Sequence, residues 1–198
     1  MEFPIFINKG FPMQKPIEIL DHAIKTKRPD FHSRLNRGLT DFEIAKLEDK
    51  FHFILPYDLK ELYKWKNGQS ENCFDTFISN SMFMPLENVF ESKHCSDAMI
   101  GSDFEIENWW NENWFPIFHD GGGNHICYDD EGTFTEGRGQ ILEFWHADND
   151  RNVIFPNLLS FLESIAKFYA ITEAEDFDGH QEYCIQSPEG FPKRFIVE

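Results

Sequence analysis

The stretch WFPIFHDGGGNHICYD, residues 114–129, decides the fold of this chain. Two short apolar runs, 115–118 and 124–128, flank three glycines, a composition typical of two strands joined by a tight turn. Residues 140–146 predict another strand, in which apolar side chains point both ways instead of alternating with polar ones. A strand of that kind is buried on both faces. The centre of the chain therefore predicts a sheet that is covered on both sides.

Helix signals surround this sheet in the sequence. Thr40 and Glu43 match a capping box, the reciprocal pair of hydrogen bonds that begins many helices. Leu39 is placed to pack against Ile44 across the first turn. Prolines suit the first turn of a helix, and further helices are predicted to begin near Pro56, Pro85 and Pro156. Helical spacing predicts these inward-facing residues: Ile44, Leu47, Phe51, Leu59, Leu62, Tyr63, Leu86, Val89, Phe90, Leu158, Leu162, Ile165 and Tyr169.

The flanking segments complete the predicted domain organisation. Residues 1–37 are interpreted as an N-terminal extension with one short helix, which begins at Pro16, ends before Pro29 and is able to fold back on the acidic half. Residues 38–171 form a single domain, and 172–198 an acidic linker and tail that ends in an edge strand. Within the domain, a short strand is expected over 81–84, and Asn67-Gly68 is expected to end the helix that begins at Pro56. The fold class is α+β: a twisted, largely antiparallel sheet flanked by helices.

Charge is distributed unevenly along the chain. The formal net charge is -17, and residues 101–198 hold 20 acidic against 5 basic residues. Nucleic acid is excluded as a partner because phosphate binding depends on Lys and Arg. A basic protein is the expected counterpart. The sequence contains neither a signal peptide nor an apolar run long enough for a membrane span, so no membrane contact is expected and the predicted location is cytoplasmic.

Chemistry-bearing motifs are weak. The spacing of His119, Asp120 and His125 matches no metal site, so a polar turn is the favoured interpretation. Residues 129–132 resemble the start of a calcium loop, but Arg138 stands where the bidentate glutamate is needed. Four widely separated cysteines, expected to be reduced and mostly buried, match neither a zinc ribbon nor a redox pair: Cys73, Cys95, Cys127 and Cys184. We therefore predict no catalytic residue, no metal and no cofactor.

These landmarks together resemble the SUKH superfamily, which contains the Smi/Knr-type regulators of fungal cell-wall assembly and many bacterial immunity proteins. The resemblance covers about residues 39–169. It rests on the capped helix followed by Leu55-Pro56, Asn67-Gly68-Gln69, Met84-Pro85-Leu86-Glu87, Trp114-Phe115-Pro116-Ile117, Gly121–Gly123, Asp129, Gly139 and Ser160-Phe161-Leu162. It implies an α+β domain that acts by binding rather than by catalysis. It also places Trp114 in the core.

The predicted partner-binding residues combine carboxylates with tryptophans. They are Asp103, Glu105, Glu107, Trp109, Trp110, Glu112, Asp129, Asp130 and Glu131. Because Trp109 and Trp110 are neighbours, in a strand they would point to opposite faces, which would leave one ring exposed as an anchor. The acidic tip at 129–131 fits a solvated turn as well as it fits a patch for a basic partner.

The leading hypothesis is an immunity protein that neutralises a basic toxin, such as a nuclease, through its acidic surface. A cellular regulatory scaffold and a glycan-binding module that uses Trp109 and Trp110 are the alternatives. The sequence does not determine the oligomeric state.

Overall fold

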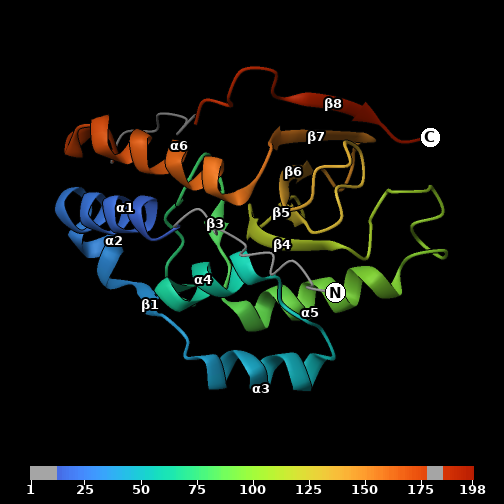
Figure 1. Ribbon diagram of the computed structural model, residues 1–198, viewed down its shortest axis with the longest axis horizontal. Coiled ribbons are helices and arrows are strands. Elements are labelled where there is room, and N and C mark those ends of the chain that lie inside the picture. Colours follow the sequence, from blue (N-terminus) through green and yellow to red (C-terminus); the bar gives the residue numbers. More distant parts are fainter. Residues whose placement is uncertain (1–12, 178–184) are drawn as a thin grey trace, which may run out of the picture.

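The computed structural model describes residues 13–177 and 185–198 as an α+β body built on an antiparallel sheet (Figure 1). Its six strands follow one another in chain order, each antiparallel to the next. They are β3 (Met82–Phe83), β4 (Trp114–His119), β5 (His125–Asp129), β6 (Gln140–Phe144), β7 (Asp150–Phe155) and β8 (Lys193–Ile196). The predicted fold class is confirmed.

Helices and one small sheet surround these strands. The helices are α1 (Gln14–Lys27), α2 (Pro29–Ser33), α3 (Asp41–Phe51), α4 (Tyr57–Trp65), α5 (Leu86–Ala98), α6 (Leu158–Ile171) and the 3-10 helix η1 (Ala174–Phe177). A separate pair of strands, β1 (Leu35–Arg37) and β2 (Lys66–Gln69), joins the segment before α3 to the segment after α4. No helix in the described ranges combines the length and apolarity that a membrane crossing requires.

The local helix signals are confirmed. The Thr40 hydroxyl accepts a hydrogen bond from the Glu43 backbone, and the Glu43 carboxylate accepts one from the Thr40 backbone at 2.9 Å. Pro56 and Pro85 occupy the N-cap positions of α4 and α5. Asn157, one residue after the predicted start at Pro156, caps α6.

The predicted end of α4 is wrong. The helix ends at Trp65, and residues 66–69 form β2 instead of a left-handed helix cap. Gly68 does adopt positive φ, but it does so within this strand, where a Cβ would lie 2.3 Å from the backbone nitrogen of Pro85. Only glycine fits there, because the chain before α5 passes too closely for any side chain.

Residues 13–37 contribute to the core. α1 lies beside α6, which belongs to the acidic half of the chain, and Leu20 and Ile24 are fully buried (Figure 1). The predicted stop at Pro29 is confirmed as the end of α1, although this proline also begins the second helix, α2. The boundaries at 37/38 and 171/172 remain predictions, but residues 14–37 pack as an integral layer of the structure.

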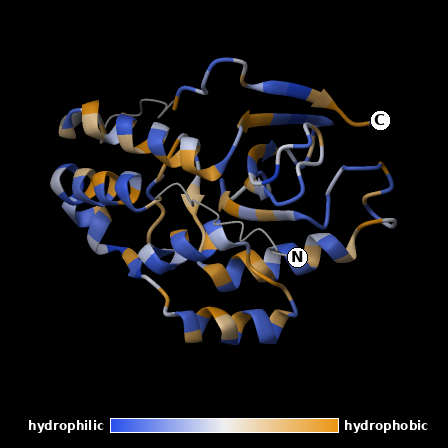
Figure 2. Ribbon diagram, in the orientation of Figure 1, coloured by the Kyte–Doolittle hydropathy of each residue, from blue (hydrophilic) through white to orange (hydrophobic). Residues whose placement is uncertain are grey.

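The large sheet is covered on both faces, by different kinds of structure. Along β5, Ile126 and Tyr128 join the main core beneath the helices, whereas Cys127 joins a second cluster on the opposite face. Figure 2 shows the hydrophobic stretches that run along the central strands. The second cluster consists of Trp110, Trp114, Cys127, Leu142, Phe144 and Val153, with the partly buried Phe104, Trp109, Phe134, Phe191 and Phe195 packed against it. We call the two sides the helix face and the loop face, because loops contribute much of the cover on the second side.

β7 was not predicted from the sequence. Its first residues, Asp150, Arg151 and Asn152, are polar and resemble a loop. Arg151 is nevertheless fully buried on the loop face. This buried guanidinium organises the site described next.

Candidate partner-binding surface

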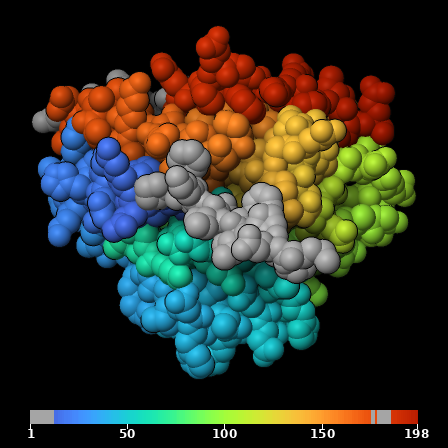
Figure 3. All heavy atoms as spheres, viewed as in Figure 1, coloured from blue at the N-terminus to red at the C-terminus, as the bar shows by residue number. Residues whose placement is uncertain are grey.

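The segment between α5 and β4, residues 99–113, carries most of the predicted partner-binding residues, and we call it the acidic loop. It forms the green shoulder at the right of the molecule in Figure 3. Four of its carboxylates are exposed: Asp103, Glu105, Glu107 and Glu112. Within residues 13–177 and 185–198, none of the four forms an ion pair. The loop therefore presents uncompensated negative charge to solvent.

Trp110 anchors this loop and is not exposed, which corrects its predicted role as a contact residue. Only 2% of the residue is accessible. Its ring packs edge-on against Phe144 at 5.1 Å, and its indole N–H donates to the Asp97 carboxylate at 2.8 Å. A ring buried in this way is removed from any partner.

Lys93 holds the end of the acidic loop from α5. Its side chain is almost fully buried and pairs with Asp97 at 2.9 Å. The ammonium group also donates to the backbone carbonyl of Glu112 and lies 5.1 Å from the centre of the Phe115 ring. Asp97 thus fixes both Lys93 and Trp110, so one carboxylate secures two points of the loop.

Arg151 holds the middle of the acidic loop from β7. Its guanidinium donates twice to the backbone carbonyl of Trp109, at 2.7 and 3.2 Å. The same group donates to the backbone carbonyls of Asp148 and Asp150, both at 2.7 Å, and lies 5.0 Å from the centre of the Trp109 ring. Burial lowers the pKa of Arg151 to about 10, which still leaves it charged at neutral pH. A loop without regular hydrogen bonds is thereby fixed by a buried cation that binds its carbonyls.

Trp109 is partly buried, and its ring packs with Arg151. Trp110 is inside the loop-face cluster. The prediction that the two rings separate to opposite faces of a strand is wrong, because residues 108–113 form no strand. Trp110 is buried and the Trp109 ring packs against Arg151, so the geometry does not favour glycan binding.

The β5–β6 loop, residues 130–139, lies directly beside the acidic loop. The backbone N–H of Asp130 donates to the carbonyl of Asn113 at 3.1 Å, and the Trp114 indole donates to Thr133 at 2.9 Å. The two acidic segments predicted from the sequence are therefore adjacent in space. Glu131 is exposed but pairs with Arg138 at 2.6 Å, so its charge is partly compensated.

Asp129 is a buried structural residue, which corrects its predicted role at the binding surface. Its carboxylate accepts hydrogen bonds from the backbones of Gly132 and Thr133 and from the Gln140 side chain, at 3.0, 2.6 and 3.0 Å. No part of the residue is accessible. The carboxylate shapes the loop that carries Asp130 and Glu131, and it has no free surface to meet a partner.

Asp58, at the start of α4, belongs to the same region and was missed by the sequence analysis. Burial raises the pKa of its carboxyl group, and the charges of Asp130 and Glu61 raise it further. Tyr57, beside it, is 69% exposed. The residues at the start of α4 did not predict that Asp58 lies near Asp130, because the two are more than seventy positions apart in the sequence.

The glycine turn behaves as a turn. Asp120 accepts hydrogen bonds from the backbones of Gly122 and Asn124 and from the Asn124 side chain. In the described part of the chain, no group of three or more His, Cys, Asp or Glu residues has the arrangement of a metal site. Cys73 and Cys127 are buried free thiols, Cys95 is exposed and free, and Cys184 lies outside the described residues.

Comparison with known families gives one clear match. The family described as SMI1 / KNR4 family (SUKH-1) matches residues 38–164. This match covers more than half of the chain and spans the four central strands, the first half of α6 and the acidic loop. No curated protein matches the sequence.

Proposed function

This chain belongs to the SMI1/KNR4 (SUKH-1) family, and from that premise we propose that it is an immunity protein whose acidic loop binds a basic toxin. The family includes immunity proteins and is generally non-catalytic. The proposed binding surface combines Asp103, Glu105, Glu107 and Glu112 with Asp130 and Glu131 of the adjoining loop, and Asp58 joins it from α4.

One observation carries this proposal: the exposed carboxylates of the acidic loop have no ion-pair partners among the residues that the structure describes, although the loop that presents them is fixed by buried contacts. Mobile surface charges lose side-chain and backbone entropy when they are ordered against a partner. Here Arg151 and Lys93 hold the loop backbone before binding. The charges are therefore arranged in advance for a cationic surface.

Complementary charge acts mainly on the rate of association and on the choice of partner. A basic nuclease toxin has a cationic channel that binds nucleic-acid phosphates. An acidic surface that covers this channel would block its substrate without any chemical step. Binding of this kind weakens at high salt because ions screen the exposed charges.

The test is the association rate constant with purified basic nuclease toxin domains, measured at several salt concentrations. We expect the Glu105→Gln/Glu107→Gln variant to associate several-fold more slowly at low salt and with a smaller salt dependence. The matched control is Glu163→Gln/Glu173→Gln, which removes the same charge from exposed positions elsewhere. Equal slowing by both variants would show a general effect of net charge and would contradict a specific role for the acidic loop.

A regulatory scaffold remains the alternative within this family. Deletion of residues 1–37 does not separate the two roles cleanly, because it would remove the buried Leu20 and Ile24 from the core. Alanine at exposed positions of α1, such as Glu18 and Lys25, is the better test. A scaffold that uses this helix would lose binding to cellular proteins, whereas toxin neutralisation would be unchanged.

A further inference from the structure

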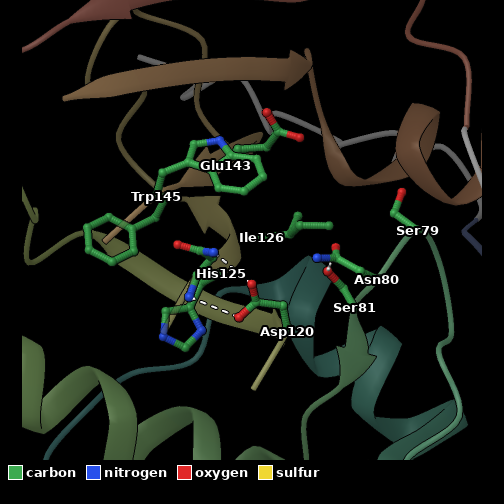
Figure 4. Close-up of a pocket in the computed structure, with 10 residues that line it drawn as sticks. Ser79, Asn80, Ser81, Asp120, His125, Ile126, Glu143 and Trp145 are labelled. Carbon is green, nitrogen blue, oxygen red and sulfur yellow. Dashed lines mark hydrogen bonds between the residues drawn. The ribbon is translucent and has the colours of Figure 1, made fainter. Parts of the chain in front are cut away.

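A small hollow lies at the other end of the central strands. Its walls come from residues 79–81, the β4–β5 turn, the start of β5 and the end of β6. Figure 4 shows Trp145 and Glu143 on one side of the hollow and Asn80 and Ser81 on the other, with Asp120 at its lower edge. Two carboxylates, an indole and side-chain amides thus surround one space.

Asp120 is held in an ionised and fixed state. Burial acts to raise its pKa, but hydrogen bonds from Gly122 and Asn124 outweigh this effect, and the pKa is lowered overall. The Asn124 side chain donates to one carboxylate oxygen at 2.7 Å, and the Gly122 backbone donates to the other at 2.7 Å. The glycine turn therefore places a fixed negative charge at the edge of the hollow.

Glu143 provides the second negative charge. It is half-buried, and one of its oxygens accepts a hydrogen bond from the Asn152 side chain at 3.1 Å. Among the described residues, no Lys or Arg forms an ion pair with Asp120 or Glu143. This contrasts with Glu48, a similarly protected carboxylate on α3, which pairs with Lys60 at 2.9 Å. Within the described part of the chain, the negative charges of Asp120 and Glu143 are therefore not balanced by an ion pair with Lys or Arg.

Trp145 gives the hollow an aromatic wall and connects it to the acidic loop. The residue is 36% exposed. Its backbone carbonyl accepts a hydrogen bond from Arg151 at 3.3 Å, and the same guanidinium binds the carbonyl of Trp109. One buried arginine therefore sets the position of the hollow relative to the acidic loop.

We propose that this hollow binds the side chain of an arginine from a basic protein partner. The inference rests on the proposed function, and it names a second contact for the same partner. A guanidinium is planar, stacks on an indole and donates several hydrogen bonds in one plane to carboxylate and amide oxygens. The hollow offers these three kinds of group together in Trp145, Glu143 and Asn80, while Asp120 adds a negative charge at its edge.

The test is an NMR titration of the full chain with N-acetyl-arginine methylamide as the probe. We expect selective shifts of the Trp145 indole N–H and of the Asn80 and Asn124 side-chain amides, with millimolar affinity. The citrulline analogue, which has nearly the same shape without the charge, should leave these signals unchanged. Glu143→Gln should weaken binding several-fold, whereas Glu163→Gln, an equal change on α6, should have no effect.

Two outcomes would overturn the proposal: equal shifts with citrulline, or shifts that persist unchanged in both Glu143→Gln and Trp145→Ala. Backbone spectra of each variant establish that it is folded. The result is also separable from the proposed function. If toxin binding depends on Glu105 and Glu107 but not on Glu143, the acidic loop binds the partner without an arginine in the hollow. If the arginine probe binds but no basic toxin does, the proposed function is wrong, whereas the proposal that the hollow binds arginine still holds.

Discussion

The two faces of the large sheet are covered by different means. On the helix face, the helices α1, α4, α5 and α6 bury apolar side chains such as Leu20, Leu59 and Ile165. Their backbones satisfy their own hydrogen bonds, so apolar contact is enough to hold them. On the loop face, the acidic loop has no such repeat, and Lys93 and Arg151 bind its carbonyls instead.

This difference shows how a loop without regular secondary structure is held in place. Buried cations draw the backbone carbonyls inward, while the carboxylate side chains of the same loop remain outside. The helix face contributes stability, and the loop face contributes stability together with an organised field of negative charge. Four predictions test this comparison, beginning with the largest expected effect.

Arg151→Met should disrupt the loop face most. It leaves the backbone carbonyls of Trp109, Asp148 and Asp150 without their donor, which we expect to cost about 3 kcal/mol in the free energy of unfolding. Chemical denaturation measures this loss. Hydrogen exchange should accelerate in residues 100–113 and remain slow in α6. Equal acceleration in α6 would mean that the two faces do not differ in the way described.

Arg151→Lys is the matched control for this change. It keeps a positive charge but presents a single ammonium group in place of the planar fork. We expect a stability between those of the native protein and Arg151→Met. A lysine variant as stable as the native protein would indicate that charge alone, without the fork of donors, holds the loop.

Acid should weaken the loop face through His125. Burial lowers the pKa of this histidine to about 4, and its Nδ1 atom has no hydrogen-bond partner in the described ranges of the chain. The pKa of His125 in the folded state lies below the unfolded value of about 6.5. The contribution of neutral His125 to the free energy of unfolding is therefore complete above about pH 6.5 and is lost as the pH falls towards 4. The full loss is on the order of 3 kcal/mol.

The measurement is the free energy of unfolding at several pH values for the native protein and His125→Phe. Phenylalanine can keep the stacking of this ring on Phe144 but cannot take up a proton. The native protein should lose more stability than the variant between pH 6.5 and 4. Parallel curves would rule out protonation of His125 as a source of acid sensitivity.

Asp129→Ala should destabilise the β5–β6 loop by about 2 kcal/mol, because two backbone N–H groups and the Gln140 amide lose their acceptor. Thermal unfolding measures the loss. Glu131→Ala, one residue beyond Asp130 and exposed, should change stability little. Similar losses in both variants would contradict the distinction between the buried structural carboxylate and the surface one.

Thr40→Ala should have the smallest effect, about 1 kcal/mol, through loss of the α3 cap. This helix lies away from the acidic loop in Figure 1, so partner binding should not change. The free energy of unfolding and the affinity for the partner, both measured on the same preparation, test this prediction. A fall in affinity would extend the binding surface to a region that the proposal leaves out.

The sequence predicted the helix face better than the loop face. Thr40, Pro56 and Pro85 identify helix starts from adjacent residues alone, and helical spacing then identifies buried positions such as Leu162. Such signals are local, so they can be found without knowledge of the fold. The strands over 115–118 and 124–128 were predicted in the same way, whereas the burial of Trp114 was implied by the resemblance to the SUKH superfamily.

The loop face depends on contacts that are distant in the sequence. Nothing near Trp110 indicates that Asp97 binds its indole, and nothing near Trp109 indicates that Arg151 binds its carbonyl. Arg151 itself made β7 resemble an exposed loop. The exposed acidic residues of the candidate site could be listed from sequence, whereas the burial of Asp129 and Trp110 followed only from the fold.

The most direct test of the central claim is hydrogen exchange of the full chain with and without the basic toxin domain. The account predicts new protection in residues 100–113 and 130–136, with little change in α1 and α6. Protection concentrated in α1 and α6, with the acidic loop unchanged, would contradict it.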